Sequence, residues 1–78
     1  MSGTPLLVDA RGMRCPWPVL RVARAARQAG AGALIHVVAD DPAAPGELAR
    51  LVEANGWSMS AADTAIGPGS AIMVSSRG

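Results

Sequence analysis

Residues 6–39, LLVDARGMRCPWPVLRVARAARQAGAGALIHVVA, decide the fold of this chain. The apolar residues 6–8 end at Asp9 and predict a short strand, and residues 34–39 predict a second, almost continuously apolar strand. Between them, residues 16–29 predict a helix because apolar side chains recur at spacings of three and four, namely Val19, Val22, Ala23 and Ala26. A strand, a helix and a strand of these lengths predict a right-handed βαβ unit with parallel strands.

The remainder of the chain predicts one more helix and two more strands. Glycines at residues 30–32 end the first helix, and Asp40-Asp41-Pro42 ends the second strand. Residues 45–54 predict the second helix, while residues 57–63 and 71–76 predict strands on either side of a turn at Gly67-Pro68-Gly69. The predicted order is β-α-β-α-β-β, with two helices on one face of a four-stranded mixed sheet. We expect a single domain over residues 1–78, with residues 1–5 flexible.

The composition indicates an aliphatic core and gives no strong sign of a charged partner. The chain has 78 residues, of which half are hydrophobic, yet Trp17 and Trp57 are its only aromatic residues. Its net charge of +1 gives no overall attraction to nucleic acid or to a membrane. The sequence has no signal-peptide pattern and no run of about 18 apolar residues. With a single cysteine, these features favour a cytoplasmic protein.

Cys15 is the only cysteine and lies in the sequence Cys15-Pro16-Trp17-Pro18. It cannot form an intramolecular disulfide, and with one histidine in the chain we expect no metal site. The remaining possibilities are a buried apolar side chain or a nucleophilic thiol. We predict Cys15 as the N-cap of the first helix, with both prolines in the opening turn. The helix N-terminus, Arg11 and Arg14 would then favour the thiolate over the thiol.

Charged residues near this motif have both structural and functional interpretations. Asp9 closes the first strand and is placed to pair with Arg11 or Arg14. Asp40 and Asp41 fit ordinary turn and cap chemistry, a metal site or a contact with a docking partner. His36 is predicted on the open face of the sheet, away from the thiol, because its neighbours in the strand are aliphatic.

The outer face of the first helix has two interpretations. Trp17 lies beside the thiol and fits either a partner-binding anchor or simple packing. Arg21, Arg24 and Arg27 fit a solvated surface, or a contact with an acidic partner or RNA. These arginines lack the interleaved aromatic residues of a platform for single-stranded nucleic acid.

The chain resembles the TusA/SirA-like family of sulfur carriers. Residues 8–18 are similar to that family's signature around a Cys-Pro-x-Pro motif, and residues 38–43 and 53–57 resemble two further family blocks in the right order. Two departures concern the surface. Trp17 stands where an acidic residue is common, and Glu47-Leu48-Ala49 stands where the family has an aspartate followed by Ile-Pro.

The resemblance implies a two-layer α/β sandwich in which Cys15 carries sulfur as a persulfide, with Pro16 and Pro18 as supporting prolines. It implies a cysteine desulfurase or another sulfur donor, a downstream acceptor protein, and no cofactor apart from the covalent persulfide. We expect no direct contact with nucleic acid or membrane, a monomer when free, and action with partner proteins rather than as an autonomous enzyme. The alternatives are a regulatory or interaction module with a redox-sensitive or structural cysteine, and a small thiol peroxidase.

Overall fold

The computed structural model describes residues 5–75, which form four strands and two helices. In chain order these are β1 (Leu6–Ala10), α1 (Trp17–Ala29), β2 (Leu34–Ala39), α2 (Ala44–Asn55), β3 (Ser58–Thr64) and β4 (Gly67–Met73). The predicted β-α-β-α-β-β order is confirmed. Neither helix in this part of the chain is long and apolar enough to cross a membrane.

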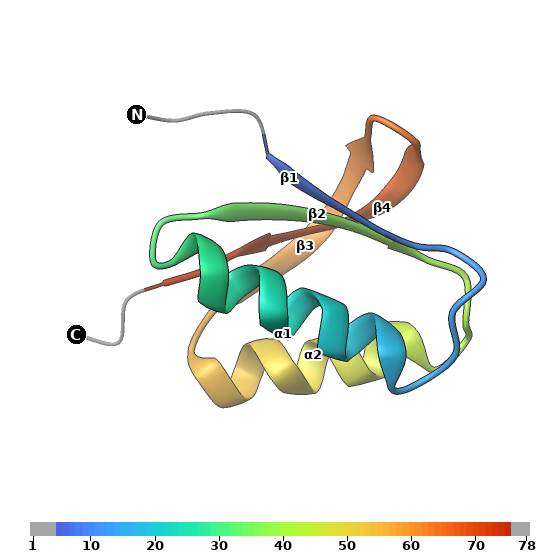
Figure 1. The fold of residues 1–78 in the computed structure, drawn as a ribbon, viewed down its shortest axis with the longest axis horizontal. Helices are drawn as coiled ribbons and strands as arrows, with labels where there is room; N and C mark the ends of the chain where they lie inside the picture. The colour runs from blue at the N-terminus through green and yellow to red at the C-terminus, as the bar shows by residue number, and fades with distance from the viewer. Residues whose placement is uncertain (1–4, 76–78) are drawn as a thin grey trace.

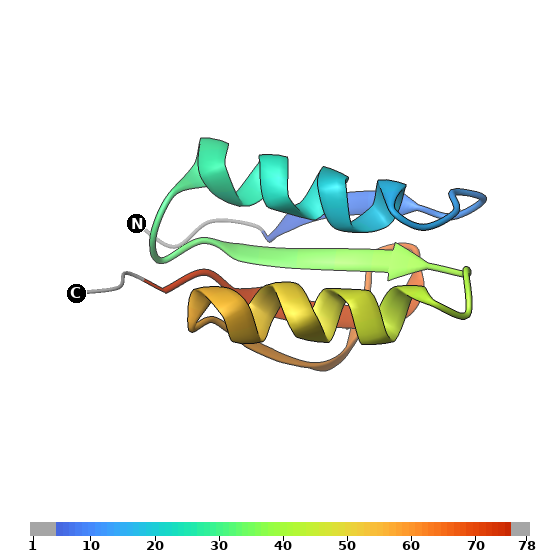
Figure 2. The same cartoon turned by 90° about the horizontal axis from the view of Figure 1, so that it is seen from below.

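The four strands form one mixed sheet in the order β1-β2-β4-β3. Strands β1 and β2 are parallel, with Val8 opposite Val37, as the predicted βαβ unit requires. Strand β4 pairs antiparallel with both β2 and β3. Both helices pack on the same face of this sheet (Figures 1 and 2). The architecture is therefore the expected two-layer α/β sandwich, and it leaves β1 at an edge of the sheet.

The core lies between the sheet and the two helices and is aliphatic, as the composition predicts. Its most buried side chains come from both layers: Val22 of α1, Ile35 and Val37 of β2, and Ile72 of β4. Because side chains alternate along a strand, burial of Ile35 and Val37 directs the intervening His36 to the open face. The structure thus separates the only histidine from the helix layer and from the loop that carries Cys15.

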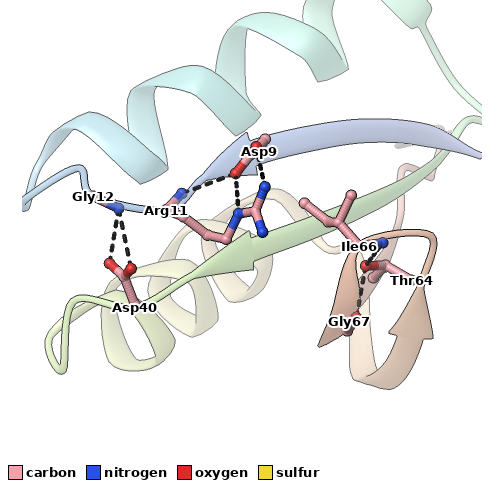
Figure 3. A network of polar contacts seen from close by, with 7 residues as sticks. All are labelled: Asp9, Arg11, Gly12, Asp40, Thr64, Ile66 and Gly67. Carbon is pink, nitrogen blue, oxygen red and sulfur yellow. Dashed lines mark hydrogen bonds and ion pairs between the residues drawn. The ribbon is translucent and has the colours of Figure 1, made fainter.

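The β3–β4 hairpin differs from the prediction. The turn lies at residues 65–66, and residues 67–69, predicted as the turn, are the first part of β4. The Thr64 hydroxyl donates to the Gly67 carbonyl oxygen at 2.6 Å, and the Ile66 N–H donates to the Thr64 hydroxyl at 3.2 Å (Figure 3). The turn is closed by the Thr64 side chain, and the glycine-proline pattern used for the prediction gives no sign of such a contact.

Pro68 and Gly69 can both lie within strand β4, and each has its own structural reason. Pairing between β2 and β4 ends at Val37 opposite Ser70, so Pro68 has only β3 beside it and needs no N–H toward β2. Gly69 lies so close to β2 that an added Cβ would overlap the carbonyl oxygen of Val37. These residues therefore permit close approach of strands. The predicted strand end at Ser76 lies outside the described residues.

Candidate functional site around Cys15

Cys15 is exposed in the loop between β1 and α1. It lies two residues before the first residue of the helix, one residue further from it than predicted. Helix α1 begins at Trp17 with Pro16 as its N-cap, because the Leu20 N–H donates to the Pro16 carbonyl at 3.1 Å. The Trp17 N–H donates to the Arg14 carbonyl at 2.8 Å, which closes a turn around the thiol-bearing residue. The prediction of Cys15 as N-cap was wrong by one residue, and the Cys15–Pro16 peptide is cis.

Two carboxylates that follow β2 hold this loop by its backbone. The Cys15 N–H donates to Asp41 Oδ2 at 2.6 Å, and Asp41 Oδ1 accepts the Ala43 N–H at 3.1 Å. Asp40 accepts the Gly12 N–H with both carboxylate oxygens, at 3.0 and 3.1 Å (Figure 3). The contact with Ala43 is the expected turn chemistry. The contacts with Gly12 and Cys15 tie together segments that are far apart in the sequence.

We call the hydrogen bonds of Asp40 with Gly12 and of Asp41 with Cys15 the clamp. The sequence analysis did not identify it, although the sequence contains a signal for it. Strands β1 and β2 are parallel neighbours, so the loops that follow them both leave the sheet at the carboxyl ends of the strands. Asp40 and Asp41 open one of these loops, while Gly12 and Cys15 lie in the other. Acceptors in one loop therefore meet backbone donors in the other.

The hydrogen bonds to Asp41 favour the charged form of its carboxyl group. The N–H groups of Cys15 and Ala43 lower the pKa of its carboxyl group, and the charge of Arg14 acts in the same direction. Arg14 and the two aspartates line a shallow depression of about 400 Å³ next to the loop. A negative charge thus lies at the backbone of the cysteine, and the cationic Arg14 lines the same depression.

Asp9 pairs with Arg11, one of the two partners expected for it. The Arg11 Nε and Nη2 donate to the two carboxylate oxygens at 2.8 Å each, and the Arg11 N–H also donates to Oδ1 at 3.2 Å (Figure 3). The side-chain hydrogen bonds from Arg11 are the main reason that the pKa of Asp9 falls to about 2, and the same contact raises the pKa of Arg11. Arg11 therefore stiffens the loop and is engaged with Asp9.

The residues on either side of Pro16 have different environments. Pro18 is fully buried, on the same side of α1 as the buried Val22. Trp17 has 60% of its surface exposed, and Arg21, one turn further on, is also exposed. Within residues 5–75, no side chain forms a hydrogen bond with the Cys15 sulfur. The site is an accessible thiol on a braced loop, next to an exposed indole.

Comparisons with known proteins agree on the class of this chain. The profile of the family described as Sulfurtransferase TusA matches residues 7–74. A protein of Archaeoglobus fulgidus named "Putative sulfur carrier protein" is 41% identical over 46 residues, which cover 59% of this chain and 60% of that relative. The crystal structure of a SirA-like protein from Desulfitobacterium hafniense superposes with a TM-score of 0.73 at 27% identity, covering 88% of this chain and 95% of that one.

The two-layer α/β sandwich and these matches place the chain in the class of TusA- and SirA-like proteins. The chain belongs to the TusA family, whose match spans all six secondary-structure elements apart from Leu6.

Proposed function

We propose that this protein accepts sulfur on Cys15 as a persulfide and passes it to an acceptor protein. The observation that carries this proposal is the exposure of the only cysteine on a loop whose backbone is held by Asp41. A carrier must bring one sulfur atom within reach of two successive partners. An accessible thiol in a fixed position meets that requirement without an enclosed pocket.

The chemistry requires two exchanges at sulfur. The Cys15 thiolate attacks the outer sulfur of a persulfide on the donor, either a cysteine desulfurase or another sulfur-donating protein. The donor's S–S bond breaks as a new S–S bond forms on Cys15, and the donor leaves as a thiolate. A thiolate on the acceptor then attacks the outer sulfur of the Cys15 persulfide and releases the Cys15 thiolate. Sulfur moves between thiolates with no net oxidation or reduction.

The surrounding residues would position the thiol rather than transfer protons. Asp41 fixes the Cys15 backbone, Asp40 fixes Gly12, and Asp9 engages Arg11 in the same loop. The reaction needs no general acid, because the leaving group is a thiolate. This agrees with the location of His36 on the opposite face of the sheet. Arg14, which lines the depression next to this loop, would attract the anionic sulfur species that approach or leave.

Thiocyanate formation tests the proposal. The purified chain is incubated with a cysteine desulfurase and L-cysteine, separated from both, and treated with cyanide, which removes the outer sulfur of a persulfide as thiocyanate. We expect about one equivalent of thiocyanate per chain and none from the Cys15→Ser variant. Equal thiocyanate from the two proteins would show that the sulfur is not carried on Cys15. No thiocyanate from either, with an active desulfurase, would contradict loading by that class of donor.

A further inference from the structure

The outer face of α1 carries an exposed groove that the core and the thiol loop do not explain. Five side chains line this groove, which has a volume of about 350 Å³: Trp17, Leu20, Arg21, Arg24 and Arg27. Trp17 is 60% exposed and Leu20 is 49% exposed, although each is a large apolar side chain. The inner face of the same helix is buried through Val22 and Ala26. The groove therefore presents apolar surface that the fold leaves uncovered.

The groove also carries unbalanced positive charge. Helix α1 contains three arginines and no acidic residue. Elsewhere, Arg11 pairs with Asp9 at 2.8 Å and Arg50 pairs with Glu47 at 3.5 Å. Among residues 5–75, no carboxylate forms a salt bridge with the three arginines of α1, which are all exposed. The charge of Arg21 helps to lower the pKa of Asp9, but the ion pair of Asp9 is with Arg11, so the three guanidinium groups on this helix face can still pair with anionic groups of another molecule.

A second apolar strip lies on the other side of the same arginines. A depression of about 270 Å³ between β1 and α1 is lined by Leu6, Leu7 and Val8 together with Arg21 and Arg24. Leu6, on the helix-facing side of β1, is 44% exposed, whereas Leu7 is paired with His36 and its side chain points to the open face of the sheet. Because β1 is an edge strand, no further strand of the sheet covers this side. Arg21 and Arg24 therefore lie between two exposed apolar strips, one on α1 and one on β1.

We propose that this face binds an acidic segment of the protein that exchanges sulfur with Cys15. Carboxylates of that segment would pair with Arg21, Arg24 and Arg27, and an apolar side chain would cover Trp17 and Leu20. This inference rests on the proposed carrier function. The groove starts two residues after the thiol and runs about 15 Å along the helix, which accommodates roughly four or five extended residues. A segment seated there would bring its protein to the thiol.

The apolar component of the surface favours a protein segment over nucleic acid. Leu6 and Leu20 offer aliphatic contacts, whereas binding of single-stranded nucleic acid relies on several aromatic stacking partners. Trp17 is the only aromatic residue in either depression. The net charge of the whole chain is +1, so positive charge is concentrated on α1 rather than spread over the molecule. Local charge beside apolar surface is typical of a specific protein contact.

The test uses a short synthetic peptide in which glutamates and a leucine fall on the same face of the extended chain, and a matched peptide with glutamine in place of glutamate. Each is titrated into the ¹⁵N-labelled full chain at low salt. We expect shifts of the Trp17 indole N–H and the α1 amides with the glutamate peptide, and roughly tenfold weaker binding of the glutamine peptide, since three exposed ion pairs are lost. Added salt should weaken binding of the glutamate peptide. The Arg24→Glu variant should bind the glutamate peptide more weakly than the wild type does. The Arg50→Glu variant, an equal charge reversal on α2, should bind it as the wild type does.

Equal affinities for the two peptides, or shifts outside α1 and β1, would overturn the inference. So would tighter binding of a single-stranded oligothymidylate than of the glutamate peptide, which would assign the face to nucleic acid. Loading of Cys15 by inorganic polysulfide is measured in parallel, because it requires no protein partner. If the chain loads normally but does not discriminate between the peptides, the inference fails and the carrier function stands. If the chain does not load, the carrier function fails whatever the peptides do.

Discussion

The backbone N–H of Cys15 donates a 2.6 Å hydrogen bond to Oδ2 of Asp41, 26 positions further along the chain. The bond connects the loop after β1 to the loop after β2, and the parallel pairing of these strands brings the two loops together. Asp41 also accepts the Ala43 N–H, so its carboxylate is itself held in place. Asp41 therefore ties the backbone of the thiol-bearing residue to the loop that follows β2.

Asp41→Asn should slow sulfur loading while leaving the fold intact. The amide loses the charge and one of the two acceptor oxygens that receive the Cys15 and Ala43 N–H groups. We expect loading by a sulfur donor to fall roughly tenfold or more, as when a reacting atom is misplaced by about 1 Å. The control is Asp63→Asn, which changes an exposed carboxylate on β3 in the same way. Equal loading by both variants would show that the clamp does not position the thiol.

Acid should remove the stability that the Asp9–Arg11 pair provides. The pKa of Asp9 is about 2 in the folded protein against 3.8 for the unperturbed group, so the unfolded chain binds more protons between these values. The contribution is fully present above about pH 4 and is lost as pH falls toward 2. Urea unfolding of the wild type and Asp9→Asn should differ most near neutral pH and converge in acid. A difference independent of pH would contradict this account.

Pro18→Ala should destabilise the protein as well as affect sulfur transfer. Pro18 is fully buried, although it lies in the opening turn of α1 close to the thiol. Loss of its buried ring carbons and of its restricted backbone should cost about 2 kcal/mol. Pro45 provides a matched control, since it is also the second residue of a helix but is exposed. Thermal unfolding should show a clearly larger loss for Pro18→Ala; equal losses would mean that burial is not the cause.

Trp17→Ala should weaken partner binding without lowering stability. The side chain is 60% exposed beside the thiol, so its removal leaves the core unchanged, whereas a contact residue of this type contributes more than about 1 kcal/mol to association. Trp57→Ala is the converse control, because Trp57 packs against the core. Thermal melts and calorimetric titration with a desulfurase that loads the chain separate the effects. A destabilised Trp17→Ala variant with unchanged affinity would assign the indole to packing.

The order of elements could be predicted from the sequence because each carries its own periodicity or apolar run. The predicted second strand, residues 34–39, has the bounds of β2. The β3–β4 turn could not be placed, because it is closed by the Thr64 hydroxyl, while Gly69 serves close packing against Val37. The first is a local side-chain contact and the second is a tertiary contact, and a glycine-proline pattern reports neither.

The site could be predicted in part. The exposed cysteine follows from a lone thiol between arginines and prolines, and the Asp9–Arg11 pair follows from proximity in the chain. The clamp by Asp41 depends on which loops become neighbours, so it requires the parallel pairing of β1 and β2 before it can be inferred. The burial of Pro18 follows from helical periodicity, because Pro18 lies four residues before the buried Val22, whereas Trp17 lies off that face.

Intact-mass spectrometry of the chain after incubation with a cysteine desulfurase and L-cysteine tests the central claim most directly. We predict a gain of the mass of one sulfur atom, located on the peptide that contains Cys15, removed by a reductant and missing in a correctly folded Cys15→Ser variant. An unmodified Cys15 in the presence of an active donor, or the same added mass in Cys15→Ser, would contradict the assignment of this residue as the sulfur carrier.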